Sequence, residues 1–251
     1  MEFSRFLDCL EADFTRLRAV VPIDPDAAVP TCPGWTVTDL TRHVGAVYLH
    51  KSAAMREGAE PDEWPPKEIA DEEPLALLDR GYAGLRQEFA TRRPEDPAGT
   101  WYAPDQTVGF WIRRMAQETV IHRIDAELGA GQQVAPIPDD LAVDGIDELL
   151  NVFVAYGVAE WADYFADILA GSPGRRYSIR ADGAAWRVRT GPGLFEVEDG
   201  SAGPADVTVS GSPAAVLRWV WNRETGPSGV TVEGAPEAVD ELKRCIRTAT
   251  Q

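Results

Sequence analysis

Apolar residues in the first 170 positions recur at steps of three and four, which is the spacing of one face of an α-helix. The clearest stripe consists of Leu75, Leu78, Tyr82, Leu85 and Phe89. Similar stripes predict further helices over about residues 3–17, 37–47, 107–128 and 140–170. Because several amphipathic helices must bury their apolar faces against one another, we expect an antiparallel helix bundle over residues 1–170.

The pattern changes after residue 170. Short segments rich in β-forming residues follow, separated by Gly, Asp and Pro turns: "YSIRA", "AWRVRT", "LFEVED" and "ADVTVSG". A helix over "SPAAVLRWVWN", a strand over "GVTVEG" and a last helix over "PEAVDELKRCIRT" complete the chain. The predicted fold is therefore an N-terminal four-helix bundle over residues 1–170, followed by a small α+β domain over residues 171–251.

The charge balance limits the classes of partner. The 251 residues carry a formal net charge of −17, spread along the chain, which disfavours nucleic acids and anionic lipid surfaces. We find neither a signal-peptide pattern in "MEFSRFLDCLEADF" nor an apolar run long enough to span a membrane, so we expect a cytoplasmic protein. Cys9, Cys32 and Cys245 are far apart and are expected to be free thiols. A monomer is favoured.

A carboxylate and an imidazole lie on the apolar face of the helix predicted over residues 107–128. Trp111, Met115, Glu118 and His122 follow the spacing of a core-facing seam. A buried carboxylate must pair, form hydrogen bonds, become protonated or bind a metal. Glu118 and His122 therefore form either an ion pair or two ligands of a metal in the bundle, and their spacing alone favours the ion pair.

The small number of histidines makes the metal hypothesis more specific. His43 lies beside the apolar face of the second predicted helix and can supply a third ligand, which leaves one position open, as in catalytic zinc sites. His50 lies two helical turns further on and is expected at the rim of the site or in solvent, with a role as fourth ligand as the less favoured alternative. Asp125 is expected either to orient the His122 ring or to act as a cap or form a salt bridge with Arg113 or Arg114.

Three segments resemble the mycothiol-dependent maleylpyruvate isomerase family: "CPGWTVTDLTRHVGAV", "RRMAQETVIHRIDAE" and "AAVLRWVWNR" with the following "GVTVEGAPEAVDELK". The resemblance implies a metal-binding bundle of the DinB/YfiT type and a sterol-carrier-like C-terminal domain. It places the ligands of a divalent metal, typically zinc, at His43, Glu118 and His122, and mycothiol as the thiol cosubstrate. It also assigns a catalytic role to Arg223.

The same resemblance implies a reaction in which a metal-activated thiolate adds to a small electrophilic substrate. A cis–trans isomerase of the maleylpyruvate type is the first hypothesis. A mycothiol S-transferase is the second, since the family contains both kinds of enzyme. A third hypothesis is a non-catalytic module that binds a small molecule or lipid and uses the metal only for structure.

Overall fold

The computed structural model describes residues 1–61, 64–200, 202–224 and 229–250. Its contacts divide the chain into two compact units, Met1–Ala135 and Pro136–Gln251. Within the described residues, no helix is both long and apolar enough to cross a membrane.

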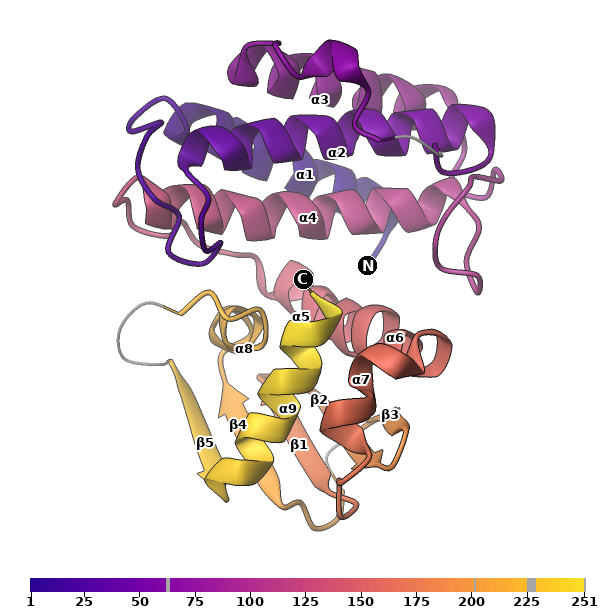
Figure 1. The fold of residues 1–251 in the computed structure, drawn as a ribbon, viewed down its shortest axis with the longest axis vertical. Helices are drawn as coiled ribbons and strands as arrows, with labels where there is room; N and C mark the ends of the chain where they lie inside the picture. Colours follow the sequence, from indigo (N-terminus) through magenta and orange to yellow (C-terminus); the bar gives the residue numbers. More distant parts are fainter. Residues whose placement is uncertain (62–63, 201, 225–228, 251) are drawn as a thin grey trace. The chain divides into compact units, whose positions relative to one another are not determined.

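The first unit is a bundle of four long helices that lie alongside one another (Figure 1). These helices are α1 (Phe3–Val20), α2 (Val37–Glu57), α3 (Pro74–Thr91) and α4 (Val108–Gly129), with a short 3-10 helix, η1 (Lys67–Ile69), between α2 and α3. Helix α2 packs against both α3 and α4, and α1 packs against α4. The helical bundle predicted from the apolar stripes is therefore confirmed.

Two local features fix α2 in the bundle. The Thr36 hydroxyl accepts a hydrogen bond from the backbone amide of Asp39, and the Asp39 carboxylate accepts one from the amide of Thr36, forming a capping box. Further along, Gly45 lies against α3, where a Cβ on Gly81 would lie 2.5 Å from the Gly45 carbonyl oxygen. The two glycines therefore allow a close crossing of α2 and α3 that larger side chains would prevent.

Helix α4 is buried on almost every side, including several of its charged residues. Arg123 forms an ion pair with Asp13, with Nε 2.8 Å from Oδ1, and its Nη1 donates to Glu127 Oε2 at 2.8 Å. The side chains of Arg123 and Glu127 are almost completely buried. Burial raises the pKa of Asp13 to about 6, against the opposing attraction of Arg123. The bundle core thus tolerates charge where it is paired, which is the environment in which the candidate ligands lie.

The second unit begins with the segment that was predicted as one helix over residues 140–170. The structure instead has α5 (Asp139–Glu148), a π-helical stretch η2 (Leu149–Ala155), α6 (Tyr156–Glu160) and α7 (Ala162–Leu169). The break falls at Trp161, whose backbone angles (φ −127°, ψ 47°) are not helical. It lets the Phe165 ring pack back against Gly157, where a Cβ would lie 3.3 Å from that ring.

A five-stranded mixed sheet follows, with the strand order β3-β2-β1-β4-β5. The strands are β1 (Arg176–Ala181), β2 (Ala184–Gly191), β3 (Leu194–Asp199), β4 (Val207–Gly211) and β5 (Val230–Gly234), with helices α8 (Pro213–Val220) and α9 (Pro236–Ala249). Only β1 and β4 pair in parallel among the described strands. These elements match the predicted α+β region, and Glu241 of α9 accepts hydrogen bonds from Tyr177 and Thr190 of the sheet.

The boundary between the units differs from the one predicted after residue 170. Helix α5 packs against α8, while η2 packs against α9 and β3, so the segment 139–169 belongs with the sheet and not with the first bundle. Its amphipathic pattern was compatible with either set of partners, and only the packing distinguishes them.

Candidate metal centre

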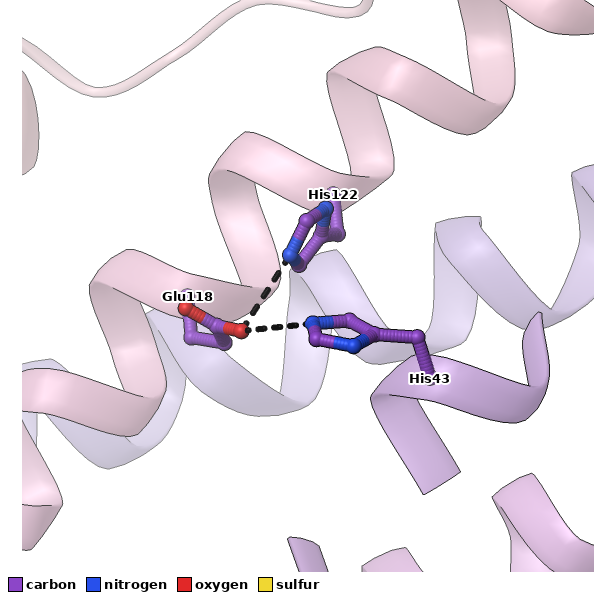
Figure 2. A group of neighbouring side chains, drawn as sticks. All are labelled: His43, Glu118 and His122. Atoms are coloured by element: carbon purple, nitrogen blue, oxygen red, sulfur yellow. Dashed lines mark ion pairs between the residues drawn. The ribbon is translucent and has the colours of Figure 1, made fainter. Parts of the chain in front are cut away.

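The structure brings His43, Glu118 and His122 together in the first unit. His43 projects from α2, and the other two project from successive turns of α4 (Figure 2). Glu118 Oε1 lies 3.5 Å from His43 Nε2 and 3.2 Å from His122 Nε2. One candidate ligand atom from each residue lies within 4.8 Å of the other two. The convergence expected from the sequence is therefore present.

The donor set fits a divalent cation of the zinc type. Two imidazole nitrogens and one carboxylate oxygen are ligands that catalytic zinc uses, with a fourth position left for water or a substrate atom. Ligand atoms bound at zinc distances in a tetrahedron lie roughly 3.4 Å apart. The two Nε2–Oε1 distances, 3.5 and 3.2 Å, are close to that spacing, and the three candidate ligand atoms all lie within 4.8 Å of one another.

Asp125 holds the His122 ring in the orientation that this site needs. Its Oδ2 lies 2.9 Å from His122 Nδ1, which directs the opposite nitrogen, Nε2, toward Glu118. Asp125 is fully buried, and its other oxygen accepts a hydrogen bond from Thr31 at 2.5 Å. The Cys32 thiol also donates, more weakly, to Asp125 Oδ2, with Sγ 3.6 Å from that oxygen. Of the roles expected for Asp125, the structure therefore shows the contact with the His122 ring.

Arg114 binds the second carboxylate oxygen of the candidate ligand Glu118. Its Nη2 donates to Glu118 Oε2 at 2.6 Å, so Oε1 alone faces the two histidines. Burial by itself would raise the pKa of Glu118, but the two imidazoles and the Arg114 guanidinium hold that pKa well below its usual range. Glu118 is therefore an anion at neutral pH, as a metal ligand must be.

The same charges act on His122 when no cation is bound. Burial disfavours the charged ring, but the carboxylates of Glu118 and Asp125 outweigh it and raise the pKa of His122 to about 9. The ring thus carries a proton at neutral pH in the metal-free protein, and metal binding must displace it.

His50 lies away from this group. Its ring contacts the Trp64 ring edge-on, and its Nδ1 lies 3.9 Å from Glu60. Burial, together with the ammonium of the neighbouring Lys51, lowers the pKa of His50 to about 4. His50 is therefore a neutral, mostly buried ring, not the solvated residue that was one of the expectations, and it does not join the ligand group.

Arg223 follows α8 in the second unit, and its backbone is fixed by a Schellman-type helix end. Asn222 has a left-handed conformation (φ 57°), and the amide of Arg223 donates to the carbonyl of Arg218 at 2.8 Å. The Arg223 guanidinium donates to the Trp221 carbonyl oxygen at 2.7 Å and lies over the Trp221 ring. Residues 225 and 226 of the expected "WNRETG" turn lie outside the described part of the chain.

The sequence did not reveal every residue of this centre. Arg114 precedes Glu118 by one helical turn, and that spacing could have identified the pair. Thr31 and Cys32 lie in an irregular loop far from α4 in the sequence, so no local pattern predicts their contact with Asp125.

We expect Asp125→Ala to weaken metal binding by about 10- to 100-fold, because the His122 ring loses the partner that orients it. Asp125→Asn keeps an acceptor for His122 Nδ1 and should lose less. Competition with a chromogenic chelator measures the affinities. Asp8→Ala, at an exposed position of α1, is the control and should bind metal as the unaltered protein does.

Comparisons with known proteins agree with this architecture. Residues 7–127 match the family model "Mycothiol maleylpyruvate isomerase N-terminal domain", and residues 140–241 match the C-terminal domain of the same family. These two ranges also fall on either side of the division after Ala135. No curated protein matches the chain.

Among solved structures, the crystal structure of the mycothiol-dependent maleylpyruvate isomerase is similar over 94% of this chain and 96% of that one, with 19% identity and a TM-score of 0.63. A histidine-to-alanine mutant of that isomerase gives the same coverage, with 17% identity and a TM-score of 0.64. A ubiquinone synthesis protein described as UbiJ-SCP2 reaches a TM-score of only 0.31, so the sterol-carrier resemblance of the second unit stays a prediction.

The two family models together account for both units, and the solved isomerase has the same fold over nearly the whole chain. The chain therefore belongs to the mycothiol-dependent maleylpyruvate isomerase family.

Proposed function

We propose that the protein is a zinc- and mycothiol-dependent enzyme that isomerises a cis-unsaturated keto acid of the maleylpyruvate type to its trans form. The observation that carries this proposal is the group His43, Glu118 and His122, which offers two nitrogens and one oxygen at zinc-like spacing in the bundle of a family named for this reaction. Three protein ligands leave a position for a thiol, whereas a purely structural zinc site would be closed by a fourth protein ligand.

The side chains around the centre prepare it for a cation. Asp125 fixes the ring of His122, and Arg114 holds one oxygen of Glu118 so that the other faces the rings. A divalent cation held by these ligands would lower the pKa of a thiol bound to it and so supply thiolate near neutral pH.

Mycothiol as thiolate would then add to one carbon of the conjugated cis double bond, and the electron pair would move onto the neighbouring carbonyl as an enolate. The former double bond becomes a single bond and rotates. Expulsion of the thiolate re-forms the double bond in the trans arrangement, so the thiol is regenerated. In this scheme Arg223 stabilises the negative charge of the enolate, as a guanidinium can through two parallel hydrogen bonds.

A turnover experiment tests the proposal. Zinc-loaded protein is mixed with mycothiol and maleylpyruvate, and formation of the trans product is followed by chromatography. We expect product only when both zinc and mycothiol are present, and loss of product after treatment with a chelator until zinc is restored. Turnover without the thiol, or unaffected by complete removal of the metal, would contradict the mechanism.

The same preparation distinguishes the S-transferase hypothesis. Incubation with mycothiol and a bimane electrophile would give a stable conjugate if the protein transfers the thiol. Conjugate formation without isomerisation would favour a transferase, and binding of mycothiol without either reaction would favour a binding module.

A further inference from the structure

A groove runs along the face of α2 that carries His43. Its cavity is about 520 Å³, within the range of small-molecule sites. One wall comes from α2, and the opposite wall comes from the segment 64–70 that follows α2. Because His43 lines this groove and also faces Glu118, the groove adjoins the candidate metal centre.

One cation lines this groove. The Arg42 side chain is half-buried, and its Nη1 donates to the carbonyl oxygen of Ile69 at 3.0 Å. Two carboxylates act on it electrostatically, but Asp39 already caps α2 through Thr36 and Glu72 is already bound by Arg80. Within the described residues, no ion pair of Arg42 with a carboxylate is found, so its guanidinium keeps donors available to a ligand.

The remaining walls are mainly apolar. Trp35 contacts the ring of His43, with ring centroids 4.8 Å apart, and Trp64, Val47 and Ile69 are among the other lining residues. Asp39 also lines the groove, but its carboxylate is bound to Thr36 at the start of α2. Such walls suit a short carbon chain, and the arginine suits a carboxylate at one end of it. The metal centre lies beside the same groove, at the side formed by His43.

We propose that Arg42 anchors a carboxylate of the substrate in this groove and so determines the preference of the enzyme for small unsaturated acids. The inference rests on the proposed function, because it assumes that the reacting part of the molecule meets the centre at His43. Arg42 is assigned a role in binding, whereas the role proposed for Arg223 concerns charge that develops during the reaction.

The test uses maleate, a cis-dicarboxylate, and zinc-loaded protein without mycothiol, so that binding is measured without turnover. Calorimetry should show that Arg42→Gln weakens maleate binding by about tenfold or more, because charge-assisted hydrogen bonds are lost. Glutamine removes the charge but keeps an uncharged amide donor on a shorter side chain, and circular dichroism checks that loss of the Nη1 contact with the Ile69 carbonyl leaves the fold intact. Arg42→Lys should retain part of the affinity.

Arg86→Ala is the matched control, since Arg86 is an exposed arginine of α3 that pairs with Glu11 outside the groove. It should bind maleate like the unaltered protein. Equal affinity of Arg42→Gln and the unaltered protein, or no binding of maleate by the latter, would overturn the inference.

Kinetics separate this inference from the proposed function. With maleylpyruvate and mycothiol, Arg42→Gln should raise KM about tenfold and leave kcat nearly unchanged, as expected for a group that binds ground state and transition state alike. Arg42-dependent maleate binding without any turnover would refute the proposed reaction but support the groove. Turnover by the unaltered protein, together with an unchanged KM in Arg42→Gln, would support the proposed reaction but refute the role of Arg42 in the groove.

Discussion

Alanine in place of His43, Glu118 or His122 is expected to remove most of the zinc from the purified protein. Each substitution deletes one of only three ligands, which should cost more than the 10- to 100-fold in affinity that is typical of losing an outer hydrogen-bond partner. Glu118→Ala should have the largest effect, because it also leaves the buried His122 ring and Arg114 without their shared carboxylate. Metal content measured by plasma mass spectrometry, together with affinity from chelator competition, checks the result.

His50→Ala is the control for this series. It removes a mostly buried histidine that lies on the same helix as His43, α2, but does not belong to the ligand group. It should keep its zinc. Circular dichroism shows whether each variant is folded, so that loss of metal is not confused with loss of structure. Full zinc content in all three ligand variants would show that the ion binds elsewhere, and loss of zinc in His50→Ala would indicate a fourth ligand.

Local sequence patterns predicted most of the helices and strands because the forces that form these elements are themselves local. The stripe from Leu75 to Phe89 became α3, and the Thr36 and Asp39 pair became the capping box of α2. The turn residues between the β-rich segments likewise separated the strands of the sheet.

The prediction was wrong where packing between distant segments decided the result. Nothing in the amphipathic pattern of residues 140–170 signals the break at Trp161, which depends on Phe165 packing against Gly157. The sequence did hold a weak signal for the division after Ala135, because Gly131 is followed by two prolines, and such residues often end a helix. In the structure Gly131 indeed has a left-handed conformation (φ 64°). The larger change of composition after residue 170 masked that signal.

The candidate site shows the same distinction. Glu118 and His122 could be paired from their spacing on one helix, and His43 could be added because the chain has only three histidines. The groove beside His43 could not be predicted, because its second wall comes from residues 64–70, whose position depends on tertiary contacts. Arg42 was overlooked for the same reason, because its side chain is positioned by a hydrogen bond to the carbonyl oxygen of Ile69 in that second wall.

Arg223→Ala is expected to retain zinc and mycothiol binding and yet to lose turnover by about a hundredfold or more, the scale on which removal of a group that stabilises developing charge acts. The Schellman-type helix end and the contact with the Trp221 carbonyl hold this arginine in place. The loss should therefore appear in kcat as well as in kcat/KM, since the enolate forms only during the reaction. Arg223→Lys should restore only part of the rate, because an ammonium cannot make two parallel hydrogen bonds.

The neighbouring Arg218 provides a matched control for Arg223. Its Nε donates to the backbone carbonyl of Arg223, so Arg218→Ala disturbs the same helix end but leaves the Arg223 guanidinium present. If charge stabilisation is the cause, Arg218→Ala keeps most of the turnover while Arg223→Ala loses it. Equal losses in the two variants would point to the local fold as the cause. Unaltered turnover in Arg223→Ala would remove this residue from the mechanism and leave the thiol addition to be supported by the groups of the first unit.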